Sequence, residues 1–166
     1  MAAPGAGGWH AAEDGGPFFI GQFPLTVDDK GRMLIPSDVR KELDDDRDGK
    51  NFILITGPNG QLWLYPEKFY KERVAPEFGG PVPDADEMDY SLMLYGTSAK
   101  LTPDKAGRVL LPDIAVDREW LGKNVVLVGV REHLELWRLD DWQEFLRQNR
   151  TRARELAARV RNRPRG

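Results

Sequence analysis

The sequence predicts an α+β fold in which two tandem β-hairpin modules are accompanied by short helices and followed by a long C-terminal helix. Two observations lead to this prediction. LTVDDKGRMLIP at residues 25–36 aligns without a gap with LTPDKAGRVLLP at residues 101–112, and seven of the twelve positions are identical. Beyond residue 140, apolar residues recur at helical spacing among arginines. An internal repeat of this kind indicates two copies of one structural unit.

Composition narrows the class of protein. The 166 residues are enough for one domain of ordinary size, or for two small repeats that share a core. Without cysteine, disulfides and thiolate metal sites are excluded, and His10 and His133 are far apart in the sequence. No apolar run approaches the roughly 18 residues of a membrane span, and the first residues lack the pattern of a secretory signal. We therefore expect a soluble, cytoplasmic protein without a metal or another cofactor.

The chain divides into five segments. We expect a disordered extension at 1–17, a first repeat at 18–74, a linker and helix at 75–97, a second repeat at 98–146 and an arginine-rich helix or tail at 147–166. The extension is rich in glycine, alanine and proline and has neither a strand nor a helix period. The linker is interrupted by prolines and a Gly-Gly pair before a helix is expected over 86–95.

Each repeat is expected to begin with a strand, a tight turn and a second strand. The turn has the sequence Asp-x-x-Gly, in which the aspartate can accept hydrogen bonds from the turn backbone and the glycine can take a positive φ. Pro36 and Pro112 end the second strands, because proline cannot donate a ladder hydrogen bond. A short helix follows, which Ser37 or Asp113 is suited to cap.

Two more strands complete each repeat. NFILI at residues 51–55 corresponds to NVVLV at 124–128, and LWLY at 62–65 corresponds to LELW at 134–137. PNG at 58–60 predicts the turn between these two strands in the first repeat. A further helix is expected to close the first repeat.

The C-terminal segment has an unusual charge. Between Arg147 and Arg165 the chain has eight arginines and one acid, Glu155, which is a local balance of +7. Since the whole chain has a formal net charge of −3, the other residues carry −10. The apolar spacing predicts one helix from just after Asp140 towards Arg161. Its arginines favour either packing in an oligomer or nonspecific attraction to phosphate, and both interpretations are open.

The repeated turns are the candidate functional site. Two interlocked hairpins would place both turns on the same side, each with two basic residues, and a two-stranded β-ribbon fits the major groove of B-DNA. Arginine can bind guanine through two hydrogen bonds, lysine neutralises phosphate, and an aspartate four residues before the arginine can orient it. The candidate DNA-binding residues are Asp28, Lys30 and Arg32 in the first repeat and Asp104, Lys105 and Arg108 in the second.

These segments resemble the MraZ family over roughly residues 18–148. FIG at 19–21 followed by DDKGR at 28–32 is similar to the family opening, F-x-G…D-x-K-G-R. DKAGRVLLP at 104–112 is similar to the second motif of the family, and VVLVG at 125–129 resembles a further segment of it. The motifs occur in the family order, and the hairpin motif occurs twice.

The resemblance implies a swapped-hairpin fold of the AbrB type and a DNA-binding transcriptional regulator. It also implies control, usually repression, of the division and cell-wall gene cluster, including the protein's own promoter. The resemblance further implies a ring-shaped homo-oligomer that binds double-stranded DNA at repeated short promoter boxes. Such a protein would be associated with the nucleoid. The D-x-x-x-R loops of the family correspond here to residues 28–32 and 104–108.

Other interpretations are open at this point. Each Asp–Arg pair is also what a turn-stabilising salt bridge needs, and exposed pairs contribute little to stability. The same fold serves a protein-binding scaffold or an antitoxin-like module, which would not need two basic turns on one side. The acidic run at 44–46 indicates a solvated loop instead of a metal site, and His133 is expected at the surface. No phosphate-binding loop, G-x-S-x-G motif or histidine cluster is present, so no enzyme is indicated.

The arginines after the two prolines are not spaced alike. Arg40 lies four residues after Pro36, whereas the same count after Pro112 leads to Val116, and Arg118 follows two residues later. The two halves therefore need not contact DNA equally.

Overall fold

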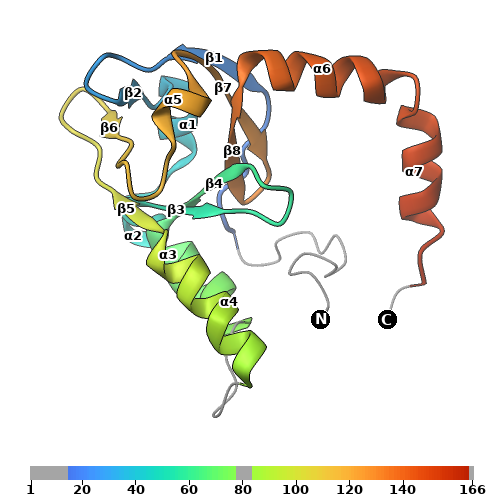
Figure 1. Ribbon diagram of the computed structural model, residues 1–166, viewed down its shortest axis with the longest axis horizontal. Helices are drawn as coiled ribbons and strands as arrows, with labels where there is room; N and C mark the ends of the chain where they lie inside the picture. Colours follow the sequence, from blue (N-terminus) through green and yellow to red (C-terminus); the bar gives the residue numbers. More distant parts are fainter. Residues whose placement is uncertain (1–14, 78–83, 165–166) are drawn as a thin grey trace.

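The computed structural model describes residues 15–77 and 84–164, so residues 1–14, most of the predicted disordered extension, lie outside the described part. The chain folds as an α+β protein with a six-stranded antiparallel sheet, a two-stranded ribbon and surrounding helices (Figure 1). The predicted fold class is confirmed, except that the C-terminal helix is divided.

The first repeat and the segment after it contain four strands and four helices with a π-helical and a 3-10 turn. They are β1 (Gln22–Thr26), β2 (Arg32–Leu34), α1 (Ser37–Glu42), α2 (Asp45–Asp48), β3 (Phe52–Thr56), β4 (Leu62–Pro66), α3 (Glu67–Phe69), the π-helical turn Tyr70–Val74, the 3-10 turn Ala75–Glu77 and α4 (Ala85–Gly96).

The second repeat and the C-terminal segment follow the same order of strands. They are β5 (Ala99–Leu101), β6 (Arg108–Leu110), α5 (Arg118–Leu121), β7 (Asn124–Val130), β8 (His133–Arg138), α6 (Leu139–Arg150) and α7 (Ala153–Arg161). We call α6 and α7 together the C-terminal arm.

The strands of the two repeats are interlocked. The order in the large sheet is β1-β7-β8-β4-β3-β5, so the first strand of each repeat pairs with the third strand of the other. Leu25 lies opposite Val125, and Leu101 lies opposite Phe52 at the equivalent position. The repeats are therefore related by an approximate twofold axis between β4 and β8, and the predicted swapped hairpins are confirmed.

The main core lies between the large sheet and the ribbon. Met33 and Ile35 of the first repeat and Val109 and Leu111 of the second are at most 1% exposed and belong to one cluster with the sheet residues. Burial stabilises the fold by about 1.5–3 kcal/mol for each such side chain. Because successive residues of a strand point to opposite faces, the intervening residues of β2 and β6 lie on the outer face of the ribbon.

The predicted helix caps are wrong in detail. Pro36, in an extended conformation, is itself the N-cap of α1, so Ser37 is already the first helical residue and makes no cap hydrogen bond. Asp113 lies in a turn before α5, and this helix is capped by Asp117, which accepts a hydrogen bond from the backbone N–H of Trp120.

The predicted single C-terminal helix is two helices. α6 ends at Arg150, and α7 begins at Ala153. Between them the backbone N–H of Arg152 donates to the carbonyl of Asn149 at 3.1 Å, and the Asn149 side chain donates to the carbonyl of Phe145 at 2.8 Å. An asparagine that binds nearby backbone competes with helix continuation. Since no residue of α7 is buried, packing within the described chain does not hold the two helices in line.

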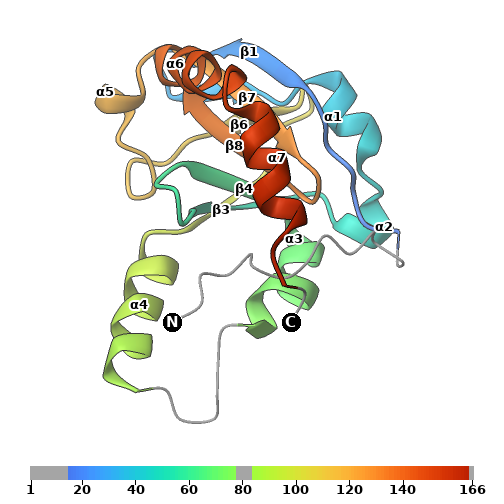
Figure 2. The same cartoon turned by 90° about the vertical axis from the view of Figure 1, so that its right-hand side faces the viewer.

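The ribbon and the C-terminal arm lie at opposite ends of the molecule. In Figure 1 the β1–β2 and β5–β6 connections reach the left edge, whereas α7 lies at the right edge. Figure 2 shows α3 and α4 projecting below the sheet, as they also do in Figure 1. None of the described helices is long and apolar enough to cross a membrane.

Candidate nucleic-acid interface

Asp28 holds the turn between β1 and β2, which we call the first loop (residues 28–32). One carboxylate oxygen accepts hydrogen bonds from the backbone N–H groups of Lys30 and Arg32, both at 2.9 Å. The other accepts a hydrogen bond from Nε of Arg32 at 2.9 Å. The N–H of Gly31 donates to the carbonyl of Asp28, and Gly31 has a φ of +78°, which favours glycine. The base of the arginine side chain is therefore fixed.

The turn between β5 and β6, the second loop (residues 104–108), has the same geometry. Asp104 accepts hydrogen bonds from the backbone N–H groups of Ala106 and Arg108 at 2.9 Å and from Nε of Arg108 at 3.0 Å. Gly107 has a φ of +86°. In both loops the aspartate binds Nε, which leaves the two terminal nitrogens of the arginine without a hydrogen bond to any described residue.

Both aspartates are stabilised in the charged form. The backbone hydrogen bond from Arg32 is the largest cause that lowers the pKa of Asp28, and the Arg32 side chain and the N–H of Lys30 lower it further. The backbone and side chain of Arg108 lower the pKa of Asp104 in the same way. Because both ion pairs are partly exposed, they contribute little to stability as salt bridges. Their clearer effect is to orient the arginines.

The ribbon brings the two loops together. In its antiparallel register Arg32 lies opposite Leu110, and Leu34 lies opposite Arg108. The outer face therefore has the arginines on one diagonal and the leucines, 44% and 54% exposed, on the other. With a strand rise of about 3.3 Å per residue, the arginine α-carbons are separated by about 7 Å along the ribbon. The six predicted residues thus lie in two loops at one edge of the molecule (Figure 1).

The family follows from comparison with known proteins. The family model described as "MraZ protein, putative antitoxin-like" matches residues 18–77 and 93–163. The chain belongs to the MraZ family. A relative from Moorella thermoacetica, named transcriptional regulator MraZ, is 30% identical over 142 residues, which are 86% of this chain and 96% of the relative.

Two further relatives carry the same name. The protein from Carboxydothermus hydrogenoformans is also 30% identical over 142 residues, with 86% of this chain and 96% of the relative covered. The protein from Lactiplantibacillus plantarum is 31% identical over 127 residues, which are 76% of this chain and 86% of the relative. The resemblance to the MraZ family that the motifs indicate is therefore confirmed.

In this MraZ-family chain, two arginines outside the predicted set lie against the loops. A Cβ atom on Gly107 would lie 3.0 Å from Cδ, Nε and Cζ of Arg40, and one on Gly31 would overlap Nη1 of Arg118. Each arginine therefore passes over the loop glycine of the other repeat. The repeat motif does not reveal this pairing, because it relates positions within each half and gives no contact between halves.

The antiparallel ribbon explains why the arginines cross over. The N–H of Ile35 donates to the carbonyl of Gly107 at 2.9 Å, and the N–H of Leu111 donates to the carbonyl of Gly31 at 2.8 Å. The start of each following helix is thereby placed beside the opposite loop. Val39 and Val116 are both buried, with 2% and 3% of their surface exposed. Val116 therefore takes the core position in the second repeat that Val39 takes in the first. The structural counterpart of Arg40 is Arg118, although counting from the prolines leads to Val116.

Glu135 is the centre of a buried polar cluster on β8 that stabilises the fold. Glu135 accepts hydrogen bonds from Nε1 of Trp137 at 2.9 Å and Nδ2 of Asn59 at 3.2 Å, and Nε2 of His133 is 3.2 Å away. Burial alone would raise the pKa of Glu135, but these three interactions outweigh it and lower the pKa. His133 is 9% exposed and stacks on Trp63 with 4.0 Å between ring centroids. The predicted surface position of His133 is therefore wrong.

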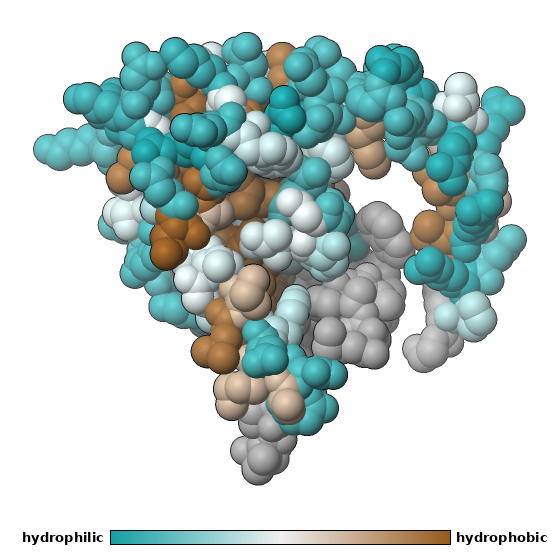
Figure 3. All heavy atoms as spheres, viewed as in Figure 1, coloured by the Kyte–Doolittle hydropathy of each residue, from teal (hydrophilic) through white to brown (hydrophobic). Residues whose placement is uncertain are grey.

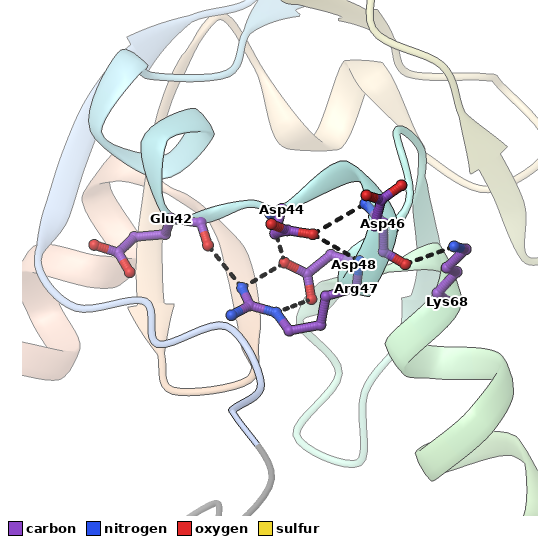
Figure 4. Close-up of polar contacts among 6 residues, drawn as sticks. All are labelled: Glu42, Asp44, Asp46, Arg47, Asp48 and Lys68. Carbon is purple, nitrogen blue, oxygen red and sulfur yellow. Dashed lines mark hydrogen bonds and ion pairs between the residues drawn. The ribbon is translucent and has the colours of Figure 1, made fainter.

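The run of three aspartates is also structural. Asp44 caps α2 by accepting hydrogen bonds from the backbone N–H groups of Asp46 and Arg47, at 3.0 and 2.8 Å. Asp48 is fully buried and binds Arg47 at 2.6 Å (Figure 4). The three aspartates are exposed to solvent, as predicted, but they begin a short capped helix and not a loop. Within the described ranges, no group of three or more acidic or histidine side chains is placed to hold a metal ion.

Proposed function

We propose that this protein is a sequence-specific, DNA-binding transcriptional regulator whose ribbon enters the major groove of double-stranded DNA. The observation that carries the proposal is the pair of equivalent arginine loops on one two-stranded ribbon. Arg32 and Arg108 read guanine bases through their terminal nitrogens. Lys30 and Lys105 contact backbone phosphates, and Asp28 and Asp104 orient the arginines.

The spacing and the neighbouring side chains support base reading. The two arginine α-carbons are about 7 Å apart along the ribbon, which is comparable to two base steps of about 3.4 Å each. Leu34 and Leu110 are exposed between the arginines, where an apolar side chain can contact the methyl group of thymine. A turn-stabilising salt bridge alone would not require these leucines to be exposed.

The regulatory part of the proposal comes from the relatives. Since they are named transcriptional regulators, we assign this chain the same role and no catalytic one. By the family resemblance, the target is the division and cell-wall gene cluster, including the protein's own promoter. The expected mode is repression through repeated short promoter boxes, with the protein associated with the nucleoid. The alternative, a protein-binding scaffold or antitoxin-like module, is supported only by the wording of the family description.

We also propose that copies of the chain form a closed homo-oligomeric ring. On α4, an acidic helix without a basic residue, Met88, Leu92 and Met93 are 47%, 65% and 67% exposed. On the arginine-rich C-terminal arm, Phe145 and Val160 are 41% and 47% exposed, and Figure 3 shows open space between the arm and the body. The opposite charges of α4 and the arm support contact between α4 of one copy and the arm of the next. Such a heterologous contact generates a ring when its rotation closes.

The DNA-binding proposal is tested with the full-length chain and two DNA fragments. One fragment comes from the region upstream of its own gene, the other is a scrambled version, and fluorescence anisotropy measures binding over a salt series. Arg108→Ala removes the hydrogen bonds to one base, so it is expected to weaken binding to the upstream fragment by about 1–3 kcal/mol and to relax specificity. Lys30→Ala is expected to weaken binding to both fragments to the same extent. It should also make the slope of log K against log salt concentration shallower.

Two comparisons decide the outcome. The double variant Arg32→Ala/Arg108→Ala should lose the preference for the upstream fragment, whereas Lys50→Ala, at an exposed site outside the loops, α4 and the arm, should keep it. The opposite outcome is that the parent protein binds both fragments with equal affinity and releases both as the salt concentration rises. In that case the proposal of sequence-specific DNA binding is wrong, and the protein-binding scaffold becomes the better supported function.

A further inference from the structure

We propose that Arg40 is a further DNA-binding residue, which contacts a phosphate beside the second loop, whereas its counterpart Arg118 only supports the first loop. The inference rests on the proposed DNA-binding function. It assigns unequal roles to two positions that the twofold relation of the repeats makes equivalent, and the difference arises from their ion pairs.

Arg118 is already neutralised within the protein. Its Nε lies 2.5 Å from Oδ1 of Asp113, and its side chain is 34% exposed. Its Nη1 is directed at the first loop, since a Cβ on Gly31 would overlap this nitrogen. A guanidinium that is paired with a carboxylate and packed against a glycine is a support for the turn and adds little net attraction for phosphate.

Arg40 has the same position on the second loop but no partner. Among the residues that the structure describes, its guanidinium makes no hydrogen bond or ion pair, and the residue is exposed. Its stem and guanidinium carbon pass over Gly107, between Lys105 and Arg108 in sequence. Three cations, Lys105, Arg108 and Arg40, are therefore gathered around one acid, Asp104, at the second loop.

The surroundings of the first loop are less positive. Besides Asp28, this loop contains Asp29, which has no acidic counterpart in the second loop and binds Lys123 at 2.9 Å. With its ion-pair partners included, the first loop has three acids and four cations. The acids are Asp28, Asp29 and Asp113, and the cations are Lys30, Arg32, Arg118 and Lys123. Electrostatic attraction to DNA is therefore expected to be stronger at the second loop.

The geometry of DNA explains why Arg40 would meet a phosphate. The major groove is about 12 Å wide and is bounded by both phosphate backbones, so a residue that flanks an inserted loop faces a backbone and not a base edge. A guanidinium with all its donors unused is suited to bind a phosphate. Arg40 should therefore raise affinity for every DNA sequence, whereas Arg108 should select among sequences.

The test is the salt dependence of DNA binding by the full-length chain, measured on the upstream and scrambled fragments. Arg40→Gln removes the charge but keeps most of the stem over Gly107. We expect the slope of log K against log salt concentration to become shallower by about 0.9, equally on both fragments. Arg40→Lys should restore the slope, which a purely structural role for Arg40 would not predict.

Matched controls separate position from charge. Lys41→Gln removes the neighbouring cation on α1, which lies 3.7 Å from Asp38, and should keep the parental slope. Circular dichroism melting checks that each variant folds, and Arg40→Met serves as a second uncharged variant if Arg40→Gln does not.

The outcomes distinguish this inference from the proposed function. A parental slope for folded Arg40→Gln, or an equal loss of slope in Lys41→Gln, overturns the role of Arg40. If the Arg32→Ala/Arg108→Ala variant loses its preference at the same time, only this inference fails. If neither the parent nor that variant prefers the upstream fragment, the proposed function fails and the inference fails with it.

Discussion

One aspartate determines the direction of each loop arginine. Asp28 uses one oxygen for two backbone N–H groups and the other for Nε of Arg32, and Asp104 does the same for Arg108. Since a short side chain can bind the backbone two residues ahead while it binds the arginine, glutamate would not reproduce this geometry. The pairing of these residues could be predicted from their spacing, because both partners lie in one short turn.

The contacts of Arg118 and the burial of His133 could not be predicted from the sequence. Arg118 reaches Gly31 across the ribbon, and no local spacing encodes a contact between positions so far apart in sequence. The sequence predicts His133 at the surface, but Trp63 and Glu135 cover it from neighbouring positions in the sheet. The sequence of one strand predicts which side chains share a face of the sheet. It does not predict which side chains of neighbouring strands cover that face.

Glu67 leads to a prediction about pH at the scale of one residue. Glu67 is 8% exposed, and hydrogen bonds from Lys71 at 2.7 Å and Asn51 at 2.6 Å, with Lys100 at 3.1 Å, lower its pKa to about 2. Since the folded pKa lies below the ordinary 4.5, the charged carboxylate stabilises the fold above pH 4.5, and this contribution is lost as pH falls towards 2. Glu67→Gln should therefore lower the free energy of unfolding by about 1.5–3 kcal/mol at pH 7.

Urea denaturation of the parent and Glu67→Gln at pH 7, 4 and 3 measures this effect. The difference in unfolding free energy should become smaller at each step of acidification. A difference that stays constant from pH 7 to pH 3 would show that the carboxylate charge does not stabilise the fold.

The ribbon depends on the rest of the molecule for its stability. β2 and β6 have three residues each, and a two-stranded ribbon alone is marginal in water. Burial of Met33 and Val109 fixes the ribbon to the core, and the backbone hydrogen bonds from Ile35 to Gly107 and from Leu111 to Gly31 join its two halves. The loops are thus presented by a rigid base even though they are exposed.

A glycine substitution tests the second loop at the element scale. Gly107→Ala places a side chain at a φ of +86° and brings its Cβ to 3.0 Å from Arg40. We expect a loss of about 1–2 kcal/mol in unfolding free energy from the backbone conformation, together with weaker DNA binding. Gly60→Ala is the matched control, since Gly60 has a φ of +78° but nothing within 4 Å of the added Cβ.

Denaturation and anisotropy are measured on both variants. Gly60→Ala should be destabilised to a similar extent and bind DNA like the parent. Equal DNA binding by Gly107→Ala and Gly60→Ala would mean that the shape of the second loop is unimportant for DNA.

Strands could be predicted more reliably than helix ends. The repeat alignment places Leu25 and Leu101 at equivalent positions, and both pair in the equivalent register. The break after Arg150 could not be predicted, because the apolar period continues through it while the Asn149 side chain and the absence of packing interrupt the helix. Hydrophobic period predicts that a helix exists, whereas its ends depend on local hydrogen bonds.

At the scale of the whole molecule, the proposed ring has a direct test. Leu92→Glu on α4 and Val160→Glu on α7 each introduce a charge on one of the two proposed contact surfaces. Light scattering after size exclusion should show rings for the parent and for Lys50→Glu, a control at an exposed site, but monomers for each of the two variants.

Mixing the two variants makes the test specific. Leu92→Glu keeps an intact arm and Val160→Glu keeps an intact α4, so one intact contact remains and only one-to-one dimers should form. Rings in either variant alone, or no dimer in the mixture of folded variants, would contradict contact between α4 and the arm. The boundaries of the five expected segments remain a prediction, which limited proteolysis of the ring would test.

The interlocked strands have a consequence for the newly made chain. β1 pairs with β7, and Leu25 lies opposite Val125, one hundred residues later. At synthesis rates of about 5–20 residues per second, β1 leaves the ribosome about 5–20 s before its partner strand exists. During this interval β1 has an open edge, and the ribbon lacks β6. A longer chain on the ribosome ahead can therefore offer its β7 to the unpaired β1 of the chain that follows on the same messenger.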